Sequence, residues 1–102
     1  MGIKIGEYTF DGPFGSTDDL EDRAGVYAII CKKDDGLYLV DVAESAKVKT
    51  SVETHDREDC WKQNCQDTLV FATHYTPDTQ QSGRKIIEEQ IRNQYKVGCG
   101  EG

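Results

Sequence analysis

The sequence predicts an α+β domain: a small three-stranded antiparallel sheet flanked by helices. Two β-rich runs follow one another across a tight-turn signal, and a third run of the same kind comes later in the chain. Stretches with the helical spacing of apolar residues lie between the second and third runs and after the third. A sheet covered by helices in this order is an α+β arrangement, and 102 residues suit one domain, residues 1–102.

The first two runs predict a β-hairpin. Residues 25–32 (GVYAIICK) and 37–42 (LYLVDV) are rich in β-branched and aromatic side chains. The Asp-Gly pair at 35–36 suits a tight turn, because both residues adopt positive φ readily. The two runs are therefore expected to pair as antiparallel strands, which brings Tyr27 and Tyr38 near each other.

The N-terminal part carries weaker signals. Residues 1–12 show a faint alternation of apolar side chains, typical either of an edge strand or of an arm packed on the core. The Asp-Gly-Pro sequence at 11–13 predicts a turn. In the polar stretch 15–24, Ser16 or Thr17 suits the N-cap of a short helical turn. We therefore expect the sheet to have one extra N-terminal edge strand, or none.

Two helices are expected between the second and third strands. The first covers about residues 46–55, with Ser45 as its N-cap and apolar residues four apart on one face. The second covers about residues 57–64 and is also short. The residues expected to anchor these helices in the core are Val48, Val52, Cys60 and Trp61.

The third strand and the last helix complete the domain. Residues 68–75 (TLVFATHY) alternate as a strand does, and Thr-Pro-Asp at 76–78 ends it. The last helix is expected from about residue 79 or 82 to Tyr95. Its apolar stripe consists of Ile87, Ile91 and Tyr95. Glu88 lies at the border of that stripe.

Charge argues against non-specific DNA binding. The formal net charge is −7, whereas nucleic-acid binding needs basic side chains to replace phosphate counterions. A local basic patch can nevertheless suffice. The last predicted helix has the only such bias, from Arg84, Lys85, Arg92 and Lys96.

Location and cysteine state follow from what the sequence lacks. The longest apolar run, residues 26–31, is too short to span a bilayer, and the first ten residues lack a signal-peptide pattern. We expect a cytoplasmic monomer with no membrane partner. Its four cysteines are then expected to be free thiols. A zinc site from His55, Cys60 and Cys65 is the weaker alternative, because the spacing matches no known ligand set.

Four segments together resemble the GIY-YIG nuclease domain. Gly-Val-Tyr at 25–27 resembles the first motif of that family, and Tyr-Leu-Val at 38–40 resembles the second, with valine in place of glycine. The stretch 55–61, which contains His-Asp-Arg and Cys-Trp, resembles a segment found in one branch of the family. Glu88 resembles the glutamate on the last helix. The resemblance covers about residues 24–100 and implies a small antiparallel sheet with flanking helices.

The resemblance implies a DNA endonuclease that uses one divalent ion, Mg²⁺ or Mn²⁺. A carboxylate with several waters holds such an ion, which stabilises the charge that builds on the phosphate. By this resemblance Glu88 is the metal ligand, Tyr27 helps to activate the attacking water, and Tyr38 positions the water or the phosphate. His55 or His74 is the expected catalytic neighbour of the tyrosines.

One position departs from the family pattern. The family holds the phosphate with an arginine on its first helix, and the resemblance places Ser51 there, which has no charge. Lys49 or Arg57 is then expected to contact the substrate instead. Two functions stay open: an active endonuclease, or a catalytically degenerate domain that binds nucleic acid or protein. A third interpretation is a small domain in which the tyrosines, Trp61 and His55 are core or rim residues.

Overall fold

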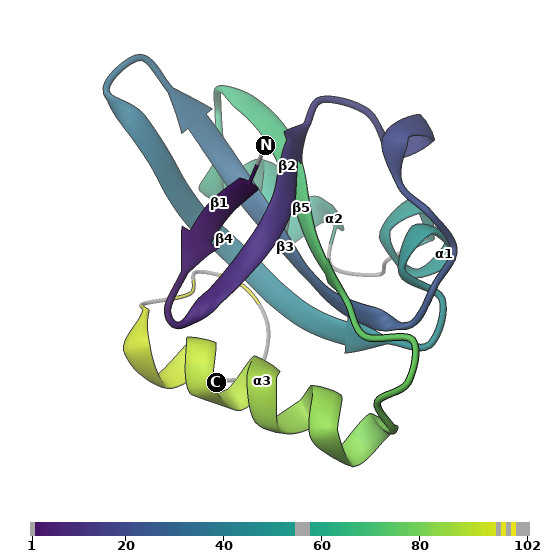
Figure 1. Cartoon of the computed structure of the whole chain (residues 1–102). Coiled ribbons are helices and arrows are strands. Elements are labelled where there is room, and N and C mark those ends of the chain that lie inside the picture. Colours follow the sequence, from purple (N-terminus) through teal and green to yellow (C-terminus); the bar gives the residue numbers. More distant parts are fainter. Residues whose placement is uncertain (1, 55–57, 96, 98, 100–102) are drawn as a thin grey trace.

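The computed structural model describes residues 2–54, 58–95, 97 and 99. In this part of the chain, five strands form one antiparallel sheet in the order β1-β2-β5-β3-β4 (Figure 1). The sheet curls into half a barrel and helices flank it. The expectation of three strands with at most one extra edge strand was wrong. The N-terminal residues form a complete hairpin that extends the sheet beyond β5.

From β3 onward, the elements follow the predicted order along the chain. The strands are β1 Gly2–Ile5, β2 Tyr8–Phe14, β3 Gly25–Lys33, β4 Gly36–Ser45 and β5 Thr68–Tyr75. The helices are α1 Val48–Glu53, α2 Glu58–Asn64 and α3 Gln81–Gln94, with a single 3₁₀ turn at Thr17–Asp19. Ser16 caps that turn, and its hydroxyl accepts a hydrogen bond from the amide of Asp18.

The N-terminal hairpin explains the extra strands. β1 pairs with β2, and Ile3 lies opposite Phe10 in this pair. β2 pairs with β5 through its residues Asp11 and Phe14. The register shifts between those two residues, where Gly12 has a φ of 119° and precedes a proline. Proline lacks the amide that a strand ladder needs and sits in sheets mainly at edges and irregularities. The Asp-Gly-Pro sequence at 11–13, which predicted a turn, therefore forms an irregularity inside β2.

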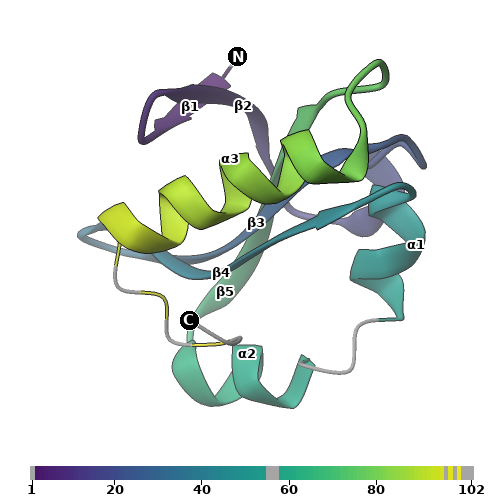
Figure 2. The same ribbon diagram turned by 90° about the horizontal axis from the view of Figure 1, so that it is seen from below.

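The sheet separates two hydrophobic cores. Alternate residues of β3 point to opposite faces: Tyr27, Ile29 and Cys31 to one, and the residues between them to the other. The first face carries α1 and α2, which contribute Val48, Val52 and Trp61. The second face is covered by α3, with Ile91 fully buried. Figure 2 shows α3 and α2 on opposite sides of the sheet.

Two disulfides hold α2 and the C-terminal segment against the sheet. Cys31 is bonded to Cys65, and Cys60 is bonded to Cys99. No cysteine is therefore a free thiol, and the expectation of four free thiols was wrong. The partners are 34 and 39 residues apart in sequence, so only the tertiary packing of β3, α2 and the C-terminal segment brings them together. A zinc site that uses Cys60 and Cys65 is excluded in this state, because thiolates are its ligands.

Candidate functional site

Tyr27 lies inside the protein. Its side chain is 2% exposed and belongs to the core under α1 and α2, where it packs with Trp61. The glycine before it in the motif has a packing role. A Cβ atom on Gly25 would lie 2.6 Å from the carbonyl oxygen of His74, so only glycine allows β3 and β5 to approach here.

Tyr38 lies far from Tyr27, near the turn of the hairpin. It pairs with Cys31, four residues along β3 from Tyr27, which is about 13 Å at the usual strand rise. Its hydroxyl donates a hydrogen bond of 3.0 Å to the carboxylate of Asp35. This bond, together with the charge of Asp35, raises the pKa of Tyr38 above its ordinary value of 10.0. A general base near neutral pH needs the opposite shift.

Glu88 reaches the sheet from the face opposite Tyr27. It lies on α3, and its Oε1 accepts a hydrogen bond of 2.9 Å from the amide of Glu44. Its Oε2 lies 3.5 Å from the Nε of Arg92, one helical turn away. Both carboxylate oxygens thus already have protein partners. Among the described residues, no group of three or more His, Cys, Asp or Glu side chains is arranged to hold a metal ion.

The proposed phosphate contacts lie on α1. The hydroxyl of Ser51 shares a hydrogen bond with the hydroxyl of Ser45, which also accepts from the amide of Lys47. Lys49 is half-buried on the same helix. His55 and Arg57 lie outside the described residues. The described candidates therefore come from both faces of the sheet and from the hairpin tip.

Asp22 caps α1 from a distant part of the chain. Its carboxylate accepts from the amide of Thr50 at 3.0 Å and from its hydroxyl at 2.9 Å. The backbone hydrogen bond of Thr50 is the main cause that holds the pKa of Asp22 below its usual 3.8. Because its pKa is lower in the folded protein, the ionised carboxylate of Asp22 stabilises the fold. This stabilisation is present at pH values above the ordinary pKa of 3.8 and is lost as the pH falls through the lowered pKa.

A buried charged network, which the sequence did not indicate, joins the two cores. Asp41 is 0% exposed, and its Oδ2 accepts a hydrogen bond of 2.8 Å from the indole of Trp61. Its Oδ1 pairs with Arg92 at 3.0 Å, and the Arg92 side chain is only 8% exposed. The only signal in the sequence was a single aspartate inside an apolar strand. A buried charge is tolerated only with such partners.

Two of these side chains, Asp41 and Arg92, also cap the outer edge of β4, together with Glu88 and the amide of Cys99. Cys99 donates its amide to the carbonyl of Val40 at 3.0 Å, and the guanidinium of Arg92 donates to the carbonyl of Val42. The amide of Val42 donates to Asp41 at 2.8 Å, next to the Glu44–Glu88 bond. An uncapped edge would offer these groups to another strand. Glu88 therefore has a structural role as an edge cap.

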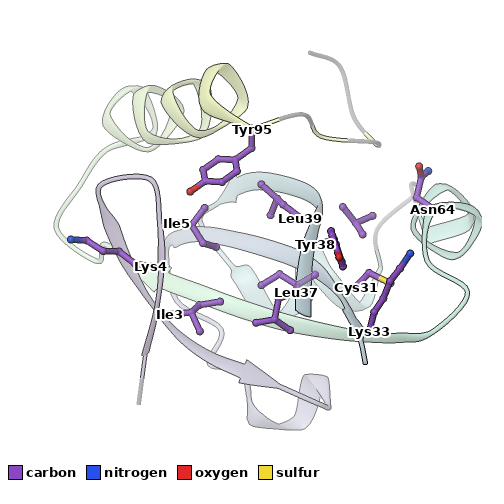
Figure 3. A pocket seen from close by; sticks show the side chains of 12 residues that line it. Ile3, Lys4, Ile5, Cys31, Lys33, Leu37, Tyr38, Leu39, Asn64 and Tyr95 are labelled. Carbon is purple, nitrogen blue, oxygen red and sulfur yellow. The ribbon is translucent and has the colours of Figure 1, made fainter. Parts of the chain in front are cut away.

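A groove of about 560 Å³ lies between β1 and the hairpin-tip end of β4 (Figure 3). Ile3 and Ile5 line one side and Leu37 and Leu39 the other, and Tyr95 at the end of α3 lies above them. The hydroxyl of Tyr95 accepts a hydrogen bond of 2.9 Å from the amide of Gly6, which ties the helix to the N-terminal hairpin. Of the described candidates, only Tyr38 lines this groove.

The groove contains most of the large apolar side chains that are exposed in the described part of the chain. Four large apolar side chains are exposed in the described part of the chain, and three of them line it: Leu37 at 44%, Tyr38 at 47% and Tyr95 at 39%. The fourth, Ile86, lies on α3 outside the groove. A clustered, exposed apolar patch is typical of an interaction site.

Comparison with known proteins adds no family. No protein-family model, curated protein or solved structure matches this chain. In the described part of the chain, no helix combines the length and apolar character needed to cross a membrane.

Proposed function

We propose that this domain is a protein-binding module whose contact site is the groove between β1 and β4. The observation that carries the proposal is the clustering of exposed Leu37, Tyr38 and Tyr95 in one concave site. Apolar pockets of about 300–1,000 Å³ with a few polar groups are the usual form of a binding site. Aromatic side chains are enriched where proteins bind each other.

Of the described residues that a nuclease would use, Glu88 and Tyr38 are engaged in other contacts, which favours binding without chemistry. Glu88 caps the edge of β4 and pairs with Arg92, and the hydrogen bond to Asp35 raises the pKa of Tyr38, which disfavours the ionised form that a general base needs. The net charge of −7 favours a polypeptide over a phosphate backbone as the partner.

Selection from a displayed library of random 12-residue peptides tests this function. We expect enriched peptides to bind the native domain and to bind Leu37→Asp about tenfold more weakly or worse, because burying a leucine contributes about 1.5–3 kcal/mol. Ile86→Asp is the matched control, since it places the same charge at the exposed apolar residue outside the groove. Affinities are measured by fluorescence anisotropy. Failure to enrich any peptide, or equal losses in both variants, would contradict the proposal.

A metal-dependent DNA endonuclease of the GIY-YIG type is the second candidate, favoured by the order of the four motifs along the chain. It requires Mg²⁺ or Mn²⁺ held by Glu88. The binding-module proposal predicts that the purified domain leaves plasmid DNA uncut with either ion. Metal-dependent cutting that Glu88→Gln abolishes and Glu89→Gln leaves intact would establish the endonuclease instead. The glutamine at 88 can still accept from the Glu44 amide, so the edge cap survives.

A further inference from the structure

The groove lies between the two free edges of the curled sheet. β1 and β4 are the outermost strands, and each lines one side of the groove (Figures 1 and 3). The caps on β4 run from Val40 to Glu44. Between Gly36 and Leu39, no hydrogen bond among the described residues covers the outer edge. The lining residues of β4 that precede the cap on Val40, residues 37–39, are therefore open to another strand.

We propose that the occupant of the groove is an extended segment of a partner protein, which adds as a strand to residues 36–39 of β4. This inference rests on the proposed function and names its binding mode. In strand addition, main-chain hydrogen bonds supply affinity, and alternate side chains fill the pockets. The open edge of four residues is about 13 Å long. The Cys99 amide on Val40 ends it, which sets where the added strand must stop.

The rim of the groove selects for acidic partners. The charged residues among its described lining are Lys4 and Lys33, and Figure 3 shows Lys33 beside Tyr38 and the Lys4 side chain directed outward from β1. The Nζ of Lys33 lies 5.3 Å from the ring centroid of Tyr38. The hydroxyl of Tyr38 donates a hydrogen bond to the carboxylate of Asp35, so a carboxylate is already a partner of the groove lining. A partner with apolar residues at alternate positions and carboxylates at its ends fits this surface.

Charge also distinguishes this partner from a second copy of the chain. Two copies that each carry a net charge of −7 repel one another, and this repulsion opposes self-association. An acidic segment of a few residues meets the local charges instead, which are Lys33 and the Asp35 carboxylate that accepts the hydroxyl hydrogen of Tyr38. Rim charges of this kind contribute mainly to specificity and to the rate of association.

The probe is a heptapeptide, Glu-Val-Thr-Val-Thr-Val-Glu, acetylated and amidated at its ends and titrated into ¹⁵N-labelled protein. All three valines direct their amides to one edge of the added strand, and both threonines direct theirs to the other. N-methylation of the valines and N-methylation of the threonines therefore block opposite edges. We expect one methylated isomer to bind about tenfold more weakly and the other to bind like the parent. The amides of residues 36–39 are expected to shift on binding.

Charge is tested on both sides of the interface. We expect the peptide with lysine in place of glutamate, and the variant Lys33→Glu, each to bind about threefold more weakly or worse. Lys85→Glu on α3 is the matched control and is expected to bind the parent peptide unchanged.

Each contrary outcome identifies what has failed. Equal binding of both methylated isomers would overturn strand addition but leave the proposed binding module in place. A groove that binds selected peptides but not the probe would have the same consequence. Equal binding of the lysine peptide would overturn the preference for acidic partners. A dimer that buries residues 36–39 in the free protein would replace the partner with a second copy. A groove that binds neither the probe nor any selected peptide would overturn the proposed function as well.

Discussion

Replacement of Asp41 by alanine is expected to lower the free energy of unfolding by about 3–5 kcal/mol, since it removes the closer of the two described carboxylates that pair with the buried charge of Arg92 and leaves Glu88 at 3.5 Å. The variant also removes the acceptor of the Trp61 indole and of the Val42 amide. Each is then a buried donor without that partner, which adds to the cost. The loss therefore reaches both cores, because Trp61 and Arg92 come from opposite faces of the sheet.

Urea denaturation followed by tryptophan fluorescence measures this loss. Asp34→Ala is the matched control. Asp34 is exposed in the hairpin turn, and its replacement removes the same charge from the chain. We expect that control to change stability by less than about 0.5 kcal/mol. Asp41→Asn keeps an acceptor for the indole, and its loss in free energy of unfolding is expected to lie between those of Asp34→Ala and Asp41→Ala. A loss below about 1 kcal/mol for Asp41→Ala would mean that the network is not a main source of stability.

Removal of the Cys60–Cys99 disulfide is expected to cost about 3–4 kcal/mol, because the bond closes a long loop and so restricts the unfolded chain. The double variant Cys60→Ser and Cys99→Ser makes the change without a reductant. The bond also holds the segment whose Cys99 amide caps Val40, so its removal is expected to lengthen the open edge of β4.

Two measurements check this second prediction. Chemical denaturation gives the stability loss, and hydrogen exchange reports on the protection of the amides in β4. The pair Cys31→Ser and Cys65→Ser provides the comparison, since it opens a loop of similar length without touching the C-terminal segment. Four thiols that titrate in the native, non-reduced protein would contradict both disulfides.

Local patterns were enough to locate the central strands and the last helix. Residues 68–75 were predicted as a strand and form β5 with those bounds, and residues 25–32 correspond to β3. Burial of one face in each element imposes a period on the sequence, and the period is visible without any partner. The N-terminal hairpin was missed because its break at Gly12 and Pro13 resembles a turn signal.

Predicting the candidate site required contacts that no local pattern contains. Tyr38 was singled out from the sequence and does line the groove, but the groove forms only when β1 curls over the hairpin tip. The placement of Tyr27 in a core and of Glu88 at a strand edge likewise depends on which face each helix covers. His55 and Arg57 lie outside the described residues, so their roles stay predictions, as do the endonuclease activity and the metal.

The sequence by itself determined that this protein has a β-hairpin, a later third strand and an amphipathic last helix, because these depend on periods of two and about four residues. Only the tertiary structure decided that the sheet has five strands, that the cysteines pair, and that Asp41 meets Arg92, which is 51 residues away in the sequence. The physical reason is that pairing between distant segments depends on the whole arrangement of the chain. The open edge beside the groove is a product of that arrangement.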